Sequence, residues 1–309
     1  MNFDLQMAIY GATIAFNLAL AVAVGAVIAA LWLPNGETAW PASQRRKIRS
    51  AGTGAILSAL VALGALLPFV SAVMAEVPVA ESTEAMVAML TESHFGMAWK
   101  FGMGALLAAL LVAAVPASGQ WRRGVAILNL LPLVIVLYTR SMVSHAAADG
   151  DLSVAVIIDW LHLCLMAVWV GAVVIAAFAT LTPGLPTEAA DRLAMAGYVD
   201  SLSSCATFAL VGIVATGLFS GWHNLGTIDS LTSHAYGNLL LLKLALVSFA
   251  VLLGGCNRFI VMPTLLTGLR EGGEAADPLR RFSLILRIEA GVLLAVLVAA
   301  AVLSATSPP

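Results

Sequence analysis

Charge is what this sequence has least of. Lys, Arg, Asp and Glu make up 10% of the 309 residues, whereas 61% are hydrophobic and the mean hydropathy is +0.98. A soluble globular chain has about a quarter of its residues charged, so that class is excluded. Three cysteines in apolar surroundings are too few to form a disulfide framework. The composition therefore predicts an integral membrane protein in contact with the lipid bilayer.

Nucleotide-binding and hydrolytic motifs are also missing. The sequence contains no G-x-x-x-x-G-K-[ST] phosphate loop and no H-E-x-x-H zinc motif. The stretches between its apolar segments are too short for a nucleotide-binding domain. These absences exclude an ATP-driven pump within this chain, and we expect no nucleotide ligand and no enzymatic activity.

Long apolar runs dominate what is present. About 20 apolar residues cross the hydrocarbon as a helix, and eight runs of that kind are found at 8–33, 50–74, 96–115, 124–146, 154–181, 202–223, 236–256 and 284–305. A chain in lipid must satisfy its own backbone hydrogen bonds, which favours helices. We predict an all-α bundle of eight transmembrane helices in two four-helix halves, residues 1–150 and 151–309.

The few charges are sorted by side. Twelve of the 15 Lys and Arg residues fall in or beside the loops that follow the odd-numbered spans. Basic residues collect on the cytoplasmic side, so both termini are predicted to be periplasmic. Acidic residues gather at the opposite, outer end, where they attract cations and repel anions. This distribution argues against nucleic acid as a partner.

All five histidines lie in the predicted outer half, either near the ends of spans or, for one of them, inside a span: His94, His145, His162, His223 and His234. Residues three or four apart share one face of a helix. Met97 lies three residues after His94, and Met142 lies three residues before His145. This repeated spacing places a thioether next to an imidazole.

The segment "DWLHLCLMAVWVGA" holds Asp159, His162 and Met166 at i, i+3 and i+7 on one helix face. A charged side chain inside hydrocarbon costs at least about 2.5 kcal/mol, so it usually faces a partner or a function. Imidazole with thioether suits Cu(I), and imidazole with carboxylate suits Cu(II) or zinc. Asp159 can also orient His162 through its second ring nitrogen.

These patterns predict one metal site at the outer ends of the third to seventh spans, with ligands drawn from His94, Met97, Met142, His145, Asp159, His162, Met166, His223 and His234. Each methionine alone is more simply a core residue. His223 and His234, beside Trp222 and Tyr236, also fit an aromatic belt at the membrane interface. The metal hypothesis therefore depends on several of these side chains converging on one ion, and not on any single residue.

Other ionisable residues inside spans are Arg140, Lys243, Arg258 and Glu289. Lys243 and Arg140 are expected to pair with an outer carboxylate such as Asp159 or to extend toward the surface. Arg258 and Glu289 are predicted to form an ion pair between the last two spans, with a proton path as the alternative. Cys205 and Cys256 are interpreted as small buried hydrophobes, and the alternative is a soft exit site for Cu(I).

Several motifs occur in one order through the second half: "DWLHLCLMAVWVGA", "GLFSGW", "SHAYGNLLLLKLALV", "CNRF" and "LRRFSLILRIEAGVLLAVLVAA". Together they resemble the copper resistance protein D (CopD) family of bacterial inner-membrane proteins over residues 155–309. The first half is similar through "SHA" at 144–146. The resemblance implies copper handling at the inner membrane, a periplasmic CopC-like copper-binding partner, and family-typical positions at His145, Asp159, His162, Lys243 and Glu289.

The leading hypothesis is a permease that captures copper, Cu(I) rather than Cu(II), at the periplasmic face and moves it inward. A second is electron transfer, with haem held between His145 and His162. A third is a sensor or assembly partner that passes copper to another membrane protein. Zinc remains an alternative ion.

Overall fold

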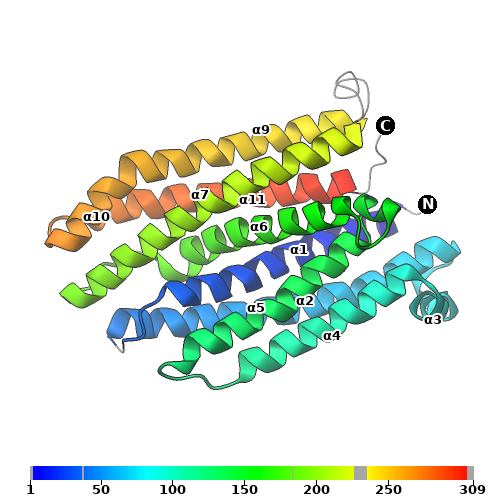
Figure 1. The fold of residues 1–309 in the computed structure, drawn as a ribbon, viewed down its shortest axis with the longest axis horizontal. Coiled ribbons are helices and arrows are strands. Elements are labelled where there is room, and N and C mark those ends of the chain that lie inside the picture. Colours follow the sequence, from blue (N-terminus) through cyan, green and yellow to red (C-terminus); the bar gives the residue numbers. More distant parts are fainter. Residues whose placement is uncertain (1–2, 37, 183, 226–234, 305–309) are drawn as a thin grey trace.

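The chain folds into a bundle of long helices, described by a computed structural model for residues 3–36, 38–182, 184–225 and 235–304 (Figure 1). Eight of them are long and apolar enough to cross a membrane, which confirms the predicted all-α architecture. These are α1 (Phe3–Trp32), α2 (Ala39–Ala75), α4 (His94–Ala114), α5 (Trp121–Met142), α6 (Val154–Ile175), α7 (Ala189–Leu225), α9 (Ala235–Cys256) and α11 (Ala276–Ser304).

Shorter helical pieces connect or extend the eight. Two 3-10 turns and a short helix lie between spans: η1 (Val79–Glu81), α3 (Thr83–Glu92) and η2 (His145–Asp149). Two π-helical turns extend spans, η3 (Ala176–Thr180) after α6 and η4 (Asn257–Val261) after α9, and α10 (Met262–Glu271) follows η4. Helix α1 begins and α11 ends at the same end of the bundle, opposite α10 (Figure 1).

Several helices are longer than their apolar runs. Helix α2 begins at Ala39 and α7 at Ala189, more than ten residues before the apolar segments predicted there. Arg, Lys and Glu are good helix formers, so a helix continues into water after the hydrocarbon ends. The predicted fourth span is too long at its other end, because α5 stops at Met142. There Ser144 accepts a hydrogen bond from the backbone N–H of Ala146 and caps η2.

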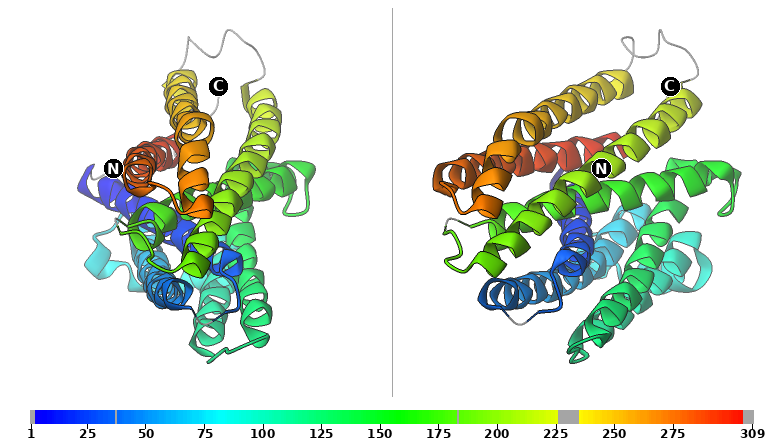
Figure 2. Two further views of the ribbon diagram at one scale, coloured as in Figure 1. Left: turned by 90° about the vertical axis from the view of Figure 1, so that its left-hand side faces the viewer. Right: turned by 60° about the vertical axis from the view of Figure 1, so that its left-hand side comes forward.

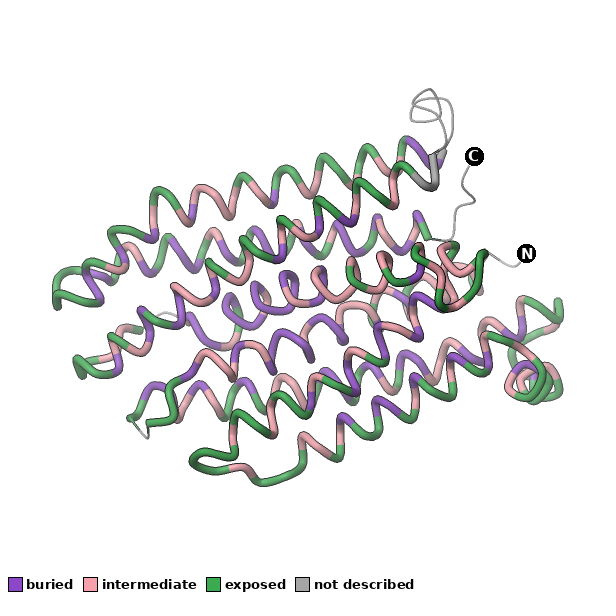
Figure 3. Tube along the Cα trace, in the orientation of Figure 1, coloured by how far each residue is buried: buried purple, intermediate pink, exposed green. Residues whose placement is uncertain are grey.

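Helix α1 lies at the centre and packs against α2 and α6 (Figure 2). The contact with α6 is closest at Gly25 and Gly171, where a Cβ on Gly171 would overlap the carbonyl oxygen of Ala21. Small residues allow this approach, which supplies packing where lipid removes the hydrophobic drive. The buried residues accordingly concentrate along α1 and the C-terminal half of α6 (Figure 3).

Helices α7 and α9 form the least covered edge of the bundle (Figure 3). Helix α9 packs mainly on α11, and α7 mainly on α6 and α10. Large apolar side chains remain on their outer faces, among them Phe208, Leu218, Phe249 and Leu252. Such faces are suited to lipid, in agreement with a membrane-spanning bundle.

Candidate functional site

The carboxylate of Asp159 lies where the end of α5 meets α6. Its Oδ2 accepts hydrogen bonds from the Ser141 hydroxyl at 2.8 Å and the Ser144 hydroxyl at 3.2 Å. Ser141 is completely buried. Charge-assisted hydrogen bonds of this kind stabilise an ionised carboxylate away from water. Asp159 is therefore a fixed, partly buried negative charge that joins two helices.

Two cationic side chains lie in the field of this carboxylate. Arg140 on α5 and Lys243 on α9 both interact electrostatically with Asp159, and both are only partly exposed. The expectation that they are oriented toward an outer carboxylate agrees with this arrangement. A charge inside a membrane bundle is tolerated when it faces an opposite charge. Asp159 thus joins α5 to α6 through the serines, with cations of α5 and α9 in its electrostatic field.

His162 lies one turn further along α6 and contacts α7. Its Nδ1 lies 2.9 Å from the hydroxyl oxygen of Thr216, and that hydroxyl lies 2.7 Å from the carbonyl oxygen of Gly212. A threonine hydroxyl has one proton. When that proton is donated to Gly212, the hydroxyl accepts from Nδ1–H, which leaves the Nε2 lone pair available to a ligand. Thr216 therefore performs the orienting role that the sequence analysis assigned to Asp159.

Gly217 lies beside this contact. A Cβ on Gly217 would lie 3.5 Å from Cε1 of His162, an ordinary contact distance, so the imidazole packs directly against α7. Met166 follows one turn deeper on α6 and is buried in the core, 7% exposed. Met142, next to Ser141 at the end of α5, is also buried. The two thioethers therefore lie within the protein interior.

The other predicted outer residues lie nearer the surface. His94 is hydrogen-bonded to Asp151, with 2.9 Å between Nε2 and Oδ1, and this contact links the start of α4 to the turn before α6. Met97 is 36% exposed one turn further along α4. His145 is exposed at the start of η2. This group lies at the same end as Asp159 and does not form a shared cluster with it.

Two predicted ligands lie at or beyond the edge of what the structure describes. His223 is in the last turns of α7, and its side chain lies outside the described set, as does His234 altogether. Among the side chains that the structure describes, no three His, Cys, Asp or Glu residues converge on one point. The described part of the site therefore consists of Asp159 with its partners and, one turn away, His162.

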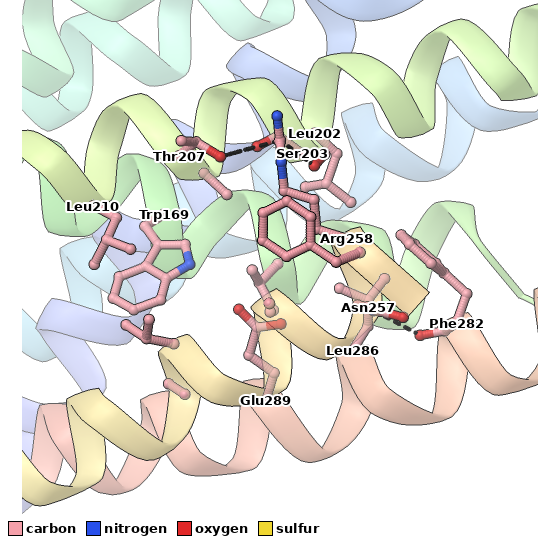
Figure 4. Close-up of a pocket in the computed structure, with 17 residues that line it drawn as sticks. Trp169, Leu202, Ser203, Thr207, Leu210, Asn257, Arg258, Phe282, Leu286 and Glu289 are labelled. Atoms are coloured by element: carbon pink, nitrogen blue, oxygen red, sulfur yellow. Dashed lines mark hydrogen bonds between the residues drawn. The ribbon is translucent and has the colours of Figure 1, made fainter. Parts of the chain in front are cut away.

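A second polar site lies toward the opposite end, in a cavity of about 200 Å³ between α6, α7, η4 and α11 (Figure 4). Arg258 donates to the hydroxyls of Ser203 and Thr207 on α7. The sequence analysis predicted that Arg258 would pair with Glu289, and this is corrected. Both residues line the cavity, but the guanidinium reaches the hydroxyl groups across it, so Arg258 links η4 to α7 and not to Glu289 on α11.

Glu289 is 3% exposed and its carboxylate faces the same cavity as the Trp169 indole (Figure 4). A Cβ on Gly254 would lie 3.5 Å from its Oε1, so α9 also passes close by. Asn257 donates to the carbonyl oxygen of Phe282, and its own Oδ1 has no hydrogen-bond partner within the described chain. Buried polar groups without partners are uncommon and mark places where water or a ligand binds.

Some residues of the site were missed from the sequence. Ser141, Ser144 and Thr216 hold the two central side chains, yet a hydroxyl in an apolar run carries little signal by itself. The spacing in "SMVSH", where two serines three positions apart precede an intramembrane aspartate, was an available clue. Asn257 precedes Arg258 in "CNRF", and the sequence analysis considered only the arginine of that motif.

Comparison with known proteins places the chain in a family. Residues 4–154 match the N-terminal domain of copper resistance protein D-like proteins, and residues 196–303 match copper resistance protein D itself. The chain belongs to the copper resistance protein D family, and it is a multi-pass membrane protein. Helix α6, with Asp159 and His162, lies between the two matched regions, which contain their partners Ser141 and Thr216.

Two curated relatives extend the comparison. The chain is 29% identical to copper resistance protein D of Pseudomonas syringae pv. tomato over 262 residues, 79% of this chain and 81% of that protein. It is 28% identical to copper transport protein CutJ of Bacillus subtilis over 224 residues, 71% of this chain. That match spans only 38% of CutJ. An inner-membrane location is consistent with these bacterial proteins. No solved structure matches the chain.

Proposed function

We propose that this protein captures copper at the end of the bundle where Asp159 and His162 lie and moves it through the C-terminal half to the other side of the membrane. The names of the two relatives, copper resistance and copper transport, support the ion. The arginine-rich loops at the other end support an orientation with the capture end, and both termini, facing the periplasm.

The observation that carries the proposal is the hydrogen bond between His162 Nδ1 and Thr216. When the Thr216 proton is donated to Gly212, Nε2 is the unprotonated ring nitrogen, and Asp159 lies one turn away on the same helix. A second ring nitrogen anchored in this way is typical of metal-binding histidines. Asp159 raises the local concentration of cations without being the anchor of the ring. Cu(I) is the preferred ion because Met166 offers a soft ligand on the same face.

A route inward follows one face of α6. His162, Met166 and Trp169 occur at i, i+4 and i+7, and Trp169 lines the inner cavity with Glu289. At 1.5 Å of rise per residue, about 10 Å separates His162 from Trp169 along the helix. We propose that copper passes from His162 by way of Met166 to this cavity. There Glu289 and the unpaired Asn257 oxygen provide polar ligands or a proton site.

Cu(I) affinity of the purified protein tests capture. A chromophoric Cu(I) chelator is titrated against wild type, His162→Ala and the control Leu161→Ala, an exposed neighbour on the lipid-facing side of α6. The proposal expects the loss of a tight site in His162→Ala alone. Equal affinity in wild type and His162→Ala would remove His162 from the site.

Copper uptake into proteoliposomes separates a permease from a sensor or assembly partner. Binding without flux across the vesicle membrane would indicate a sensor or assembly partner. Flux driven by a copper gradient would support a permease. An absorption spectrum addresses the haem alternative, because a Soret band in the purified protein would indicate a prosthetic group at His145 and His162. Delivery of copper by a periplasmic CopC-like protein remains part of the proposal. It is tested by supplying the copper bound to such a protein and measuring uptake into the proteoliposomes.

A further inference from the structure

A second and larger cavity, of about 520 Å³, lies in the N-terminal half at the arginine-rich end. Its walls come from the end of α1, the beginning of α2, the end of α4 and the beginning of α5. It does not involve α6 or α11, the helices to which Asp159, His162 and Glu289 belong. The function proposed above gives it no role.

Its mouth is lined by five arginines: Arg45, Arg46, Arg49, Arg122 and Arg123. The described part of the lining contains no Asp or Glu. Arg49 donates to the carbonyl oxygen of Ala114, a contact that positions the guanidinium but does not neutralise it. Arg46 and Arg123 are exposed at the rim. Like charges gathered around one low-dielectric hollow focus a positive potential and attract an anion.

Above the arginines the cavity becomes apolar. Small and branched side chains of three helices form this wall, namely Ala23, Ala26, Val27, Ala30, Ile56, Val112 and Ala113. Gly52 lets α2 approach α1 closely at this wall, since a Cβ there would lie 3.0 Å from the Cβ of Ala26. Inorganic phosphate would leave this wall bare, whereas an acyl chain would cover it. The gradient from cationic mouth to apolar interior fits an amphipathic anion.

One polar group interrupts the apolar wall. Asn129 on α5 is 8% exposed, lines the cavity, and has a side-chain carbonyl oxygen without a hydrogen-bond partner in the described chain. It lies seven residues beyond Arg122, about 10 Å along the helix. The amide therefore lies on the acyl-chain side of the arginines. There the amide can bond to an ester group or to a water that accompanies it.

We propose that this cavity binds an anionic phospholipid, with its phosphodiester at Arg46, Arg49 and Arg123 and one acyl chain along α1 and α2. Basic pockets between transmembrane helices recognise anionic headgroups in this way. The lipid would fill the space between α2, α4 and α5 and hold the N-terminal half together at its arginine-rich end.

Native mass spectrometry of the detergent-purified protein measures this directly. The probes are dioleoyl phosphatidylglycerol, dioleoyl phosphatidylcholine, glycerol 3-phosphate and inorganic phosphate. The proposal expects retention of phosphatidylglycerol over phosphatidylcholine, weakened by salt, and no displacement by the two soluble phosphates at equal concentration. Equal retention of the two lipids would overturn it. Displacement by glycerol 3-phosphate or inorganic phosphate would also overturn it, because the site would then belong to a free phosphate.

Variants locate the site. Arg46→Gln with Arg123→Gln removes two rim charges and is expected to weaken phosphatidylglycerol binding about 10- to 30-fold. The matched control is Arg280→Gln with Arg281→Gln, two exposed arginines at the same end on α11. Equal weakening in both pairs would show a general charge effect and reject the cavity. The headgroup comparison in wild type decides the question even when the rim variant fails to fold.

Discussion

The imidazole of His162 on α6 and the hydroxyl of Thr216 on α7 are joined by a 2.9 Å hydrogen bond at Nδ1. The bond fixes the ring against a second helix and reserves Nε2 for another partner. The carboxylate one turn away, at Asp159, is instead satisfied by the serines at the end of α5. Ring orientation and negative charge are thus supplied by different helices.

Thr216→Val tests the orienting role. The variant keeps the shape of the side chain but removes the acceptor for Nδ1–H, so we expect about 10- to 100-fold weaker Cu(I) binding, the usual cost of losing such a partner. Thr216→Ser retains the hydroxyl and is expected to bind nearly as wild type. Chelator competition measures both. Equal affinities for the valine and serine variants would mean that the hydroxyl does not orient a ligand.

Asp159→Asn tests the charge cluster. The change weakens the serine hydrogen bonds and leaves Arg140 and Lys243 without a counter-charge. We expect the free energy of unfolding to fall by about 1.5–3 kcal/mol, with Cu(I) binding weakened but not lost. Adding Lys243→Met removes one uncompensated cation and is expected to restore part of the stability. Thermal unfolding in detergent measures the stability of both variants. A further loss of stability in the double variant would argue against an interaction between Asp159 and Lys243.

Glu289→Gln separates passage from capture. Glu289 is on α11, and its carboxylate faces the 200 Å³ cavity that α6 reaches at Trp169, beyond His162. Cu(I) affinity at His162 is therefore expected to stay unchanged. Uptake into proteoliposomes should fall by roughly tenfold, equivalent to about 1.4 kcal/mol in the rate-limiting barrier. Glu271→Gln, exposed at the end of α10, is the control. Wild-type uptake in Glu289→Gln would remove the cavity from the route.

Gly171→Ala tests the contact between α1 and α6. The added methyl group overlaps the backbone of Ala21, so the helices must separate, at an expected cost of about 1–3 kcal/mol. Gly197→Ala on α7 meets no atom within 4 Å and is expected to be neutral or stabilising by about 0.5–1 kcal/mol. The two variants are compared by their thermal unfolding midpoints. Similar midpoints for the two variants would contradict a tight crossing at Gly171.

Apolar run length predicted the number and type of helices because the hydrocarbon thickness fixes how many residues are needed to cross. The same argument placed His162 and Met166 inside α6. It failed at helix ends, where the basic start of α2 remains helical in water and a serine cap stops α5 before His145. Run length measures the lipid crossing, whereas hydrogen bonding decides where a helix begins and ends.

The sequence by itself determined that this is an eight-helix membrane protein with its histidines toward one end and its arginines toward the other. Composition and periodicity suffice for that, since both act locally along the chain. Only the tertiary structure decided that His162 bonds to Thr216, that Arg258 reaches α7 rather than Glu289, and that His94 pairs with Asp151. Those partners lie 54, 55 and 57 residues apart. Which of many polar side chains meet across helices depends on how the helices are rotated and crossed, and packing at contacts such as Gly25 and Gly171 sets that geometry.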